Sequence, residues 1–363
     1  MNTYAEISLA AIKNNIAEIK KYTAAAVRFM AVVKANAYGH GAVAVSRAAV
    51  EAGADYLGVA NLKEALELRE AGILSPILIL TESPVSVADE IIQHDLTQTV
   101  YSLSEANSLS QEAQKRKKTA KVHVKIDTGM GRVGVFPSEA LAFISKIASL
   151  PALNIEGVFT HFAKAEEPED LFTEEQFQKF EQIYSRTPQI PIKHAANSAA
   201  TIFHPKTHLN MIRIGLMMYG LYPQGNSRRM VNLRPALSFK SRITYLKTVP
   251  AGTPLSYGST FVTSSETTIA TIPVGYADGY SRRLSNRGQV LVKGKRFPIV
   301  GRITMDLSLV NLGNTKAEVG DEVVLIGDQG GQGISADELA ALEDTISYEV
   351  ICAIGKRVPR VYK

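Results

Sequence analysis

Short apolar runs alternate with amphipathic stretches through the first 220 residues, and this alternation constrains the fold more than any other feature. Each of the eight runs ends near one of these residues: Lys34, Ala60, Leu80, Tyr101, Asp127, His161, Ala195 and Arg213. Such runs predict buried strands, and the stretches between them have helical spacing. Eight strand–helix repeats predict an α/β fold, a (β/α)₈ TIM-type barrel with its chemistry at the carboxyl ends of the strands. An open doubly wound sheet is the alternative, although no G-x-G-x-x-G motif follows the first run.

The pattern changes after a polar segment at residues 224–229. Beyond it, strand-like runs dominate, at residues 238–247, 267–274, 289–292, 298–302 and 322–326. One helix is predicted from Ser335 to about Glu343, because Ser335 and Glu338 have the spacing of a capping box. We therefore predict a barrel over residues 9–225, followed by a mainly β domain over residues 226–363. Residues 1–8 are predicted to form a strand that packs with the β domain.

Composition excludes several classes of protein. The 40 basic and 35 acidic residues give a net charge of +5, which is too balanced to indicate nucleic-acid binding. Cys352 is the single cysteine, so an intrachain disulfide and a cysteine-based metal cluster are both excluded. The N-terminus lacks the basic segment and apolar core of a signal peptide, and no apolar run reaches membrane-spanning length. We expect a cytoplasmic protein without a metal site.

The first predicted strand leads into the sequence FMAVVKANAYGHG at residues 29–41. Lys34 stands where the apolar run stops, so its stem has apolar surroundings that disfavour the charged form of the amine. An uncharged amine attacks carbonyl groups, which makes Lys34 a candidate for Schiff-base chemistry. A lysine that extends to solvent at a strand end is the other interpretation, and Lys34 alone does not decide between them.

Polar residues also follow the later barrel strands, in the segments KIDTGMGRVG, THF, HAANSAA and NMIRIGLMMYG. A glycine turn, structural histidines or a buried apolar segment would explain each of these alone. Arg213 is the exception, because an unpaired guanidinium in a buried segment is costly. Ser198 begins the helix after the seventh strand, and Gly215 and Leu216 follow the eighth. Barrels commonly bind phosphate in these two loops.

The stretch AVVKANAYGHG resembles the pyridoxal-phosphate attachment signature of the alanine racemases, and further motifs of that family follow in order along the chain. The resemblance implies that Lys34 carries the cofactor covalently and that Arg213 faces its pyridine nitrogen. The residues that match the family's cofactor site are Lys34, Tyr38, His161, Asn197, Ser198, Arg213, Gly215, Leu216 and Tyr348. Tyr38, Tyr348 and the loops at Ser198 and Gly215 match phosphate contacts, while His161 and His194 match partners of the arginine.

The β domain carries the remaining motifs of the family. LSYGST contains Tyr257, which matches the second catalytic base, although a strand tyrosine with its hydroxyl in water is the alternative. GYADG contains Tyr276, which matches a tyrosine at the active-site entrance. GRITMD contains Met305, whose N–H matches a donor to the substrate carboxylate, and Arg132 matches a second donor to that group. Thr304 departs from the family pattern, because many members have cysteine there.

The resemblance implies a pyridoxal-phosphate-dependent isomerase that interconverts L- and D-alanine and supplies D-alanine for cell-wall synthesis. Lys34 and Tyr257 would act as bases on opposite faces of the substrate. In the family the tyrosine comes from the partner subunit, so a homodimer is expected. Racemases of serine, lysine or several amino acids share these motifs and stay as an alternative. A non-racemising pyridoxal-phosphate-binding protein is another, although it would lack the second domain.

Lys125 lies on the fifth predicted strand, seven residues before Arg132. Alternation along this strand puts Lys121, His123 and Lys125 on one face. A lysine that points into a barrel would be a costly buried cation. Many members of the family convert this amine into an anion by carbamylation, and such an anion could hydrogen-bond Arg132. An unmodified Lys125 at the barrel mouth is the other interpretation.

Overall fold

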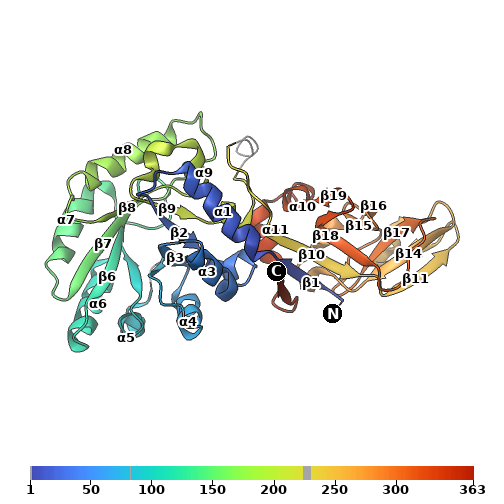
Figure 1. The fold of residues 1–363 in the computed structure, drawn as a ribbon, viewed down its shortest axis with the longest axis horizontal. Coiled ribbons are helices and arrows are strands. Elements are labelled where there is room, and N and C mark those ends of the chain that lie inside the picture. Colours follow the sequence, from blue (N-terminus) through green and yellow to red (C-terminus); the bar gives the residue numbers. More distant parts are fainter. Residues whose placement is uncertain (1, 82, 224–229) are drawn as a thin grey trace. The chain divides into compact units, whose positions relative to one another are not determined.

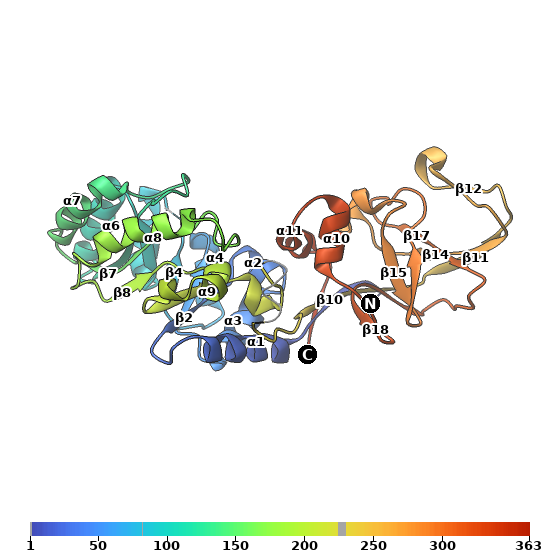
Figure 2. The same cartoon turned by 90° about the horizontal axis from the view of Figure 1, so that it is seen from above.

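A computed structural model describes residues 2–81, 83–223 and 230–363. The chain forms two compact units, drawn from two directions in Figures 1 and 2. The first comprises Ala11–Ala37 and Ala42–Arg234, and the second comprises Met1–Ala10, Tyr38–Gly41 and Pro235–Lys363. The segment 224–229, where the sequence predicts the change of domain, lies outside the described residues. Within the described ranges, no helix is long and apolar enough to cross a membrane.

The first unit contains an eight-stranded sheet with the order β8-β7-β6-β5-β4-β3-β2-β9, in which all paired strands are parallel. The strands are β2 (Arg28–Val32), β3 (Tyr56–Val59), β4 (Ile77–Ile79), β5 (Thr97–Val100), β6 (Ala120–Lys125), β7 (Leu153–Phe159), β8 (Ile192–His194) and β9 (Met211–Ile214). The Arg213 N–H donates to the Ala196 carbonyl at 3.0 Å, which joins β9 to the chain after β8 and closes the sheet. The predicted barrel is therefore confirmed.

Helices lie around the outside of this sheet (Figure 1). They are α1 (Leu9–Tyr22), α3 (Ala42–Glu51), α4 (Leu62–Glu70), α5 (Ala88–Gln93), α6 (Leu103–Lys115), α7 (Pro137–Ala148), α8 (Phe172–Tyr184) and α9 (Ser198–Phe203), with the 3₁₀ turns η1 (Val85–Val87), η2 (Pro205–His208) and η3 (Leu216–Tyr219). Helix α6 shows the common pattern, because its buried Ala106, Leu109 and Ala113 have the spacing of one helical face. Met30, Tyr56, Leu78, Ile192 and Met211 form a buried apolar cluster on five strands.

The second unit is mainly β. Its largest sheet has seven strands: β1 (Tyr4–Ile7), β10 (Leu237–Arg242), β15 (Gln289–Val292), β16 (Lys295–Pro298), β18 (Glu322–Gln329), β19 (Gln332–Ile334) and β20 (Arg360–Tyr362). A second sheet contains β11 (Tyr245–Val249), β14 (Thr267–Ile272) and β17 (Ser308–Gly313), and a third contains β12 (Pro254–Leu255) and β13 (Phe261–Val262). The helical elements are α10 (Ala336–Glu343), α11 (Ser347–Ala353), η5 (Tyr257–Ser259), η6 (Tyr276–Asp278) and η7 (Arg282–Leu284).

Two of the predicted strands in this unit were wrong in detail. The run 238–247 is two strands, β10 and β11, in different sheets. The chain changes sheet at Ile243 and Thr244, whose N–H groups donate to Asp321 and to Thr271 respectively. The run 298–302 is not a strand, because β16 ends at Pro298 and Gly301 turns the chain with a φ of 70°.

Candidate active site

Lys34 stands directly after β2, where the backbone enters a left-handed turn, α2 (Lys34–Tyr38). Ala35, Asn36, Ala37 and Tyr38 have φ values of 52°, 53°, 52° and 52°. This region costs an L-residue roughly 1–2 kcal/mol, so four such residues in succession hold several kcal/mol of strain. Strain of this kind persists where surrounding groups enforce the conformation, and it is concentrated at functional sites.

Glu64 braces this turn within the barrel unit. Its Oε1 accepts a hydrogen bond from the Ala35 N–H at 2.8 Å, and its Oε2 accepts one from the Ala60 N–H at 2.7 Å. One carboxylate therefore joins the ends of β2 and β3. Asn36 contributes a second brace, because its Oδ1 accepts from the Ala42 N–H at 2.8 Å. No sequence motif predicts this role, since the spacing of Glu64 from Asn61 indicates only a helix cap.

Arg213, on β9, is buried, and its hydrogen-bond partners among the described residues are all neutral groups. Its Nη2 donates to the carbonyls of Thr160 and Ala195, each at 2.8 Å, and lies 3.2 Å from His161 Nδ1. Its Nη1 lies 3.0 Å from His194 Nδ1. Among the described residues no carboxylate forms an ion pair with Arg213. The guanidinium is thus held by carbonyls and imidazoles, which leaves its charge uncompensated.

Burial and this charge together keep the neighbouring histidines neutral. The pKa values of His161 and His194 are lowered well below their ordinary value, first by burial and then by the positive charge of Arg213. Burial also lowers the pKa of Arg213 itself. The sequence predicted that His161 and His194 lie beside Arg213, and the structure brings all three together.

Lys125, at the end of β6, is 4 % exposed and forms no ion pair with any described residue. Its pKa is lowered to about 8, first by burial and then by the charges of Arg132, Arg213 and Lys34, whereas Asp127 raises it. Its Nζ lies 5.7 Å from the centroid of the Phe159 ring, and Arg213 Cζ lies 5.4 Å from the same centroid.

Arg132 is exposed in the loop after β6. That loop is shaped by Asp127, whose Oδ1 accepts from the N–H groups of Gly129 and Gly131, each at 3.1 Å. The positive charge of Arg132 lowers the pKa values of both Lys125 and His161.

The predicted phosphate residues meet after β8 and β9. Asn197 caps α9, because its Oδ1 accepts from the Ala200 N–H at 2.9 Å, and Ser198 is the first residue of that helix. The Gly215 N–H donates to Ser198 Oγ at 3.3 Å, and η3 begins at Leu216. Two helix starts therefore lie together, and the first N–H groups of a helix have no acceptor within it. Such a group of donors fits an anionic ligand.

In the second unit, Tyr38 is buried and its ring centroid lies 6.0 Å from that of Tyr348, on α11. Burial raises the pKa of Tyr38 well above its ordinary value, so the hydroxyl keeps its proton. Gly39 follows with its carbonyl accepting from Arg360 Nε at 2.9 Å, and a Cβ there would collide with the Ile351 carbonyl. The segment that follows the left-handed turn is therefore closely packed.

Tyr257 is 71 % exposed in the short turn η5. Ser256, just before it, has φ 59° and ψ −175°, a conformation that is essentially restricted to glycine. Ser256 Oγ donates to the Arg302 carbonyl at 2.6 Å, which holds this strained residue in place. The exposed phenol is thus presented by a backbone that cannot relax freely.

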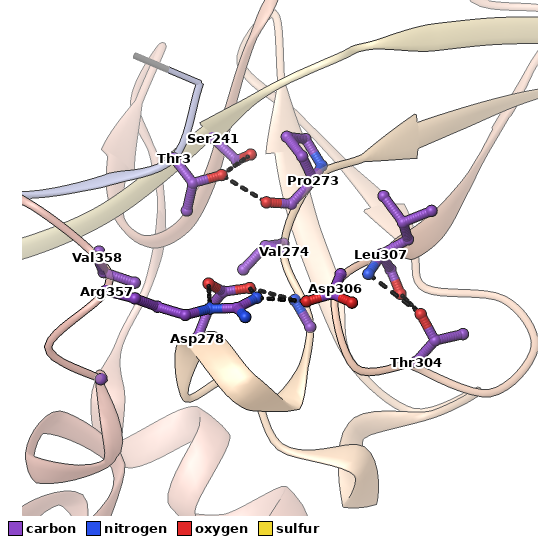
Figure 3. Close-up of polar contacts among 12 residues, drawn as sticks. Thr3, Ser241, Pro273, Val274, Asp278, Thr304, Asp306, Leu307, Arg357 and Val358 are labelled. Atoms are coloured by element: carbon purple, nitrogen blue, oxygen red, sulfur yellow. Dashed lines mark hydrogen bonds and ion pairs between the residues drawn. The ribbon is translucent and has the colours of Figure 1, made fainter.

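Tyr276 and Met305 are both exposed, and each stands near a loop residue that Arg357 binds. Figure 3 shows Arg357 between these two loop residues, Asp278 and Asp306. Arg357 Nε donates to Asp278 Oδ1 at 2.7 Å, and its Nη2 donates to Asp306 Oδ1 at 2.7 Å. The main chains are joined as well, because the N–H groups of Tyr276 and Ala277 donate to the carbonyls of Thr304 and Met305, each at 3.1 Å. Sequence reasoning missed Arg357, which has no recognisable motif.

Thr304 closes the loop that carries Met305. Its Oγ1 donates to the Leu307 carbonyl at 2.9 Å and accepts from the Leu307 N–H at 3.1 Å, as Figure 3 shows. A thiol is a weak donor and a weak acceptor, so a cysteine would make these two bonds less well. The departure from the family pattern at this position therefore strengthens the loop.

A parallel barrel with a lysine, a buried arginine and two helix starts at its strand ends, followed by a β domain, defines the class of two-domain barrel enzymes. Family models agree with this assignment along the chain: "Alanine racemase, N-terminal domain" matches residues 7–223, and "Alanine racemase, C-terminal domain" matches residues 236–362.

Proteins named alanine racemase also match this chain over almost its whole length. The alanine racemase of Halothermothrix orenii is 48 % identical over 99 % of this chain and 97 % of its own, and that of Methanococcus maripaludis is 46 % identical over 99 % and 98 %. The crystal structure of alanine racemase from Bacillus anthracis with bound L-Ala-P has a TM-score of 0.94 and 41 % identity, covering 100 % of this chain and 95 % of the other. The chain therefore belongs to the alanine racemase family, whose members are pyridoxal-phosphate-dependent isomerases.

Proposed function

We propose that this chain interconverts L- and D-alanine, with pyridoxal phosphate at the barrel mouth and with Lys34 and Tyr257 as its two bases. The observation that carries the proposal is Arg213, a buried guanidinium with neutral partners on a strand that pairs with the strand leading to Lys34. An arginine cannot give up its proton, so a pyridine nitrogen that faces it stays unprotonated. That pairing limits electron withdrawal by the ring and thereby disfavours side reactions such as transamination.

The residues at the strand ends fit this cofactor. The helix starts at Ser198 and Leu216, with Asn197 and Gly215 beside them, supply N–H and hydroxyl donors for a phosphate group. Tyr38 and Tyr348 are proposed to add their hydroxyls to the phosphate. When bound, the cofactor supplies the delocalisation that stabilises negative charge on the substrate carbon.

Racemisation requires removal of the Cα proton on one face and its return on the other. In the proposed mechanism the Lys34 amine takes the Cα proton of D-alanine, and the phenolate oxygen of Tyr257 takes that of L-alanine. His161 supports the tyrosine as a neutral donor: its Nδ1 lies 3.2 Å from Arg213 Nη2, which can only donate, and this favours the proton of His161 on Nε2.

Substrate orientation is assigned to groups that bind a carboxylate. Arg132 and the Met305 N–H are proposed to hold the substrate carboxylate, and Tyr276 is proposed to line the entrance. We further propose that Tyr257, Tyr276 and Met305 serve the barrel of a partner subunit, so that the active form is a homodimer. We expect the protein to act in the cytoplasm. Its expected role there is to supply D-alanine for cell-wall synthesis.

Lys125 is proposed to be carbamylated. Three cationic side chains, Arg132, Arg213 and Lys34, oppose a positive charge on its amine, and the same three favour a negative one. The uncharged amine would add carbon dioxide and release a proton, which leaves a carbamate anion on Nζ. That anion would hydrogen-bond Arg132 and hold its guanidinium toward the substrate.

The proposal is tested by measuring the interconversion of L- and D-alanine by the purified chain with added pyridoxal phosphate, alongside serine and lysine as substrates. Reduction with borohydride followed by peptide mapping should place the cofactor on Lys34. Racemisation of alanine with the label on Lys34 is the expected result. Label on another lysine, or faster racemisation of serine or lysine than of alanine, would contradict the assignment.

A further inference from the structure

The buried arginine is the centre of a longer chain of hydrogen bonds through the barrel. His161 Nδ1 lies 3.2 Å from Arg213 Nη2, and His194 Nδ1 lies 3.0 Å from Arg213 Nη1. Beyond His194, its Nε2 lies 2.9 Å from His123 Nδ1. His123 and His194 are fully buried, on β6 and β8. This series of hydrogen bonds therefore runs from His161, through Arg213 and His194, to His123, a histidine that the proposed mechanism does not use.

The direction of each hydrogen bond follows from the arginine. A guanidinium only donates, so His194 Nδ1 must accept and the proton of this imidazole must lie on Nε2. That N–H then donates to His123 Nδ1, which places the proton of His123 on its own Nε2. A positively charged His194 is excluded, because it would set an N–H against the N–H of Arg213. One fixed donor thus determines the tautomers of both buried imidazoles.

Packing fixes the positions of these two rings, and His123 Nε2 is buried without a hydrogen-bond partner among the described residues. Phe159 stacks on His194 with centroids 4.6 Å apart and an interplanar angle of 11°, which fixes the plane of that imidazole. Gly157, the cross-strand neighbour of His123, provides room for its ring, because a Cβ there would lie 2.6 Å from His123 Nδ1. The φ of Gly157 is not in the left-handed region, so space rather than backbone conformation explains this glycine. Burial and the charge of Arg213 lower the pKa of His123 to about 3, which keeps it able to accept.

We propose that His123 is a positioning residue that acts through His194: it accepts from the Nε2–H of His194, adds to the stability of the tautomer that accepts from Arg213, and so helps to hold the guanidinium in place. Without the acceptor on His123, the Nε2–H of His194 is left unpaired in the barrel. The other tautomer then becomes available, and its Nδ1–H faces the Nη1–H of Arg213. Only the consequence for catalysis rests on the proposed function, since the tautomers follow from the hydrogen bonds alone.

The test is nitrogen-15 NMR of the imidazoles in the full chain, with and without pyridoxal phosphate, with signals assigned by single histidine variants. His123→Asn keeps an acceptor oxygen at the place of Nδ1, whereas His123→Leu has a similar size without one. His208→Leu is the matched control for loss of a buried histidine, because the His208 imidazole bonds to the Thr201 carbonyl and to no other group in the described part of the chain. In the unaltered chain and in His123→Asn, His194 should carry its proton on Nε2. In His123→Leu its tautomers should mix, and kcat for alanine should fall about tenfold with a smaller change in KM.

The unaltered chain alone can overturn the inference, so it does not depend on a variant that folds. A proton on Nδ1 of His194, or a charged His194 between pH 6 and pH 8, would refute the assigned direction. An unchanged His194 tautomer with unchanged kcat in His123→Leu would refute the role of His123. If the chain does not racemise alanine but both rings carry Nε2–H, the proposed function fails and the tautomer assignment stands.

Discussion

Lys125 offers the sharpest energetic test, because its amine is buried near three other cations. A pKa lowered from 10.5 to about 8 means that the charged form costs about 3 kcal/mol in the folded chain. The folded state then binds fewer protons than the unfolded state between these two pKa values. Stability therefore rises with pH across this range, the reverse of the behaviour of a lysine in a salt bridge.

The perturbation is Lys125→Met, which keeps the length of the side chain and removes the amine. Between pH 7 and pH 9.5 the free energy of unfolding of the unaltered chain should rise by about 2 kcal/mol relative to the variant. Urea unfolding of both proteins in buffers free of carbon dioxide measures this difference, and other titrating groups cancel in the comparison. Parallel pH profiles for the two proteins would refute the view that Lys125 is a buried amine of lowered pKa.

Carbon dioxide gives the second arm of the same experiment. At pH 7.5 the uncharged fraction of an amine with a pKa of about 8 is roughly two hundred times that of an ordinary lysine, and only this form reacts. Bicarbonate should therefore stabilise the unaltered chain and leave Lys125→Met unchanged, because a ligand that binds only the folded state raises its stability. The activity of Lys125→Ala should be partly restored by small carboxylates. An equal response of both proteins to bicarbonate would argue against carbamylation.

Three further variants test the remaining parts of the site. Tyr257→Phe should slow deuterium exchange into L-alanine more than into D-alanine in single turnovers, and equal slowing would argue against two bases. Glu64→Gln replaces one of two acceptor oxygens with an amide donor and should lower the free energy of unfolding by about 1–2 kcal/mol in urea; Glu67→Gln on the same helix is the control, and equal effects would contradict the bracing role. Arg357→Lys should raise KM for alanine about threefold to tenfold because the Met305 loop loosens. The control is Arg287→Lys, at an exposed position, which should leave KM for alanine unchanged. An equal rise in KM for this control would contradict the role assigned to Arg357.

The barrel could be predicted from the sequence because the same pattern, an apolar run followed by a helical stretch, repeats along the chain. Each apolar run is short and ends in a polar loop, and eight such runs leave few alternatives. The β domain was harder, because a continuous run such as residues 238–247 contains no local sign that its two halves join different sheets. That division depends on partners far along the chain, Asp321 and Thr271, which propensity cannot identify.

In the candidate site, too, residues in local motifs could be predicted, whereas residues that act through distant contacts could not. Lys34, Arg213 and Ser198 stand in recognisable motifs, and their local positions could be predicted. Glu64 and Arg357 were missed, because each acts through contacts with residues that its own neighbourhood in the sequence does not reveal. One partner of Glu64 and the partners of Arg357 are distant in the sequence, whereas Lys34, Arg213 and Ser198 stand beside the strand ends and glycines that mark them.

The charges at the strand ends explain why this site costs stability in the absence of a ligand. The charges of Lys34, Arg132 and Arg213 lower the pKa of Lys125, and Asp127 is the carboxylate that raises it. The neighbouring histidines are neutral and provide no compensation. A carbamate on Lys125, a phosphate and a substrate carboxylate would each add negative charge to this cluster. On the proposed function, the repulsion among these cations and the strain of the left-handed turn are costs of folding that are offset in part when the anionic ligands bind.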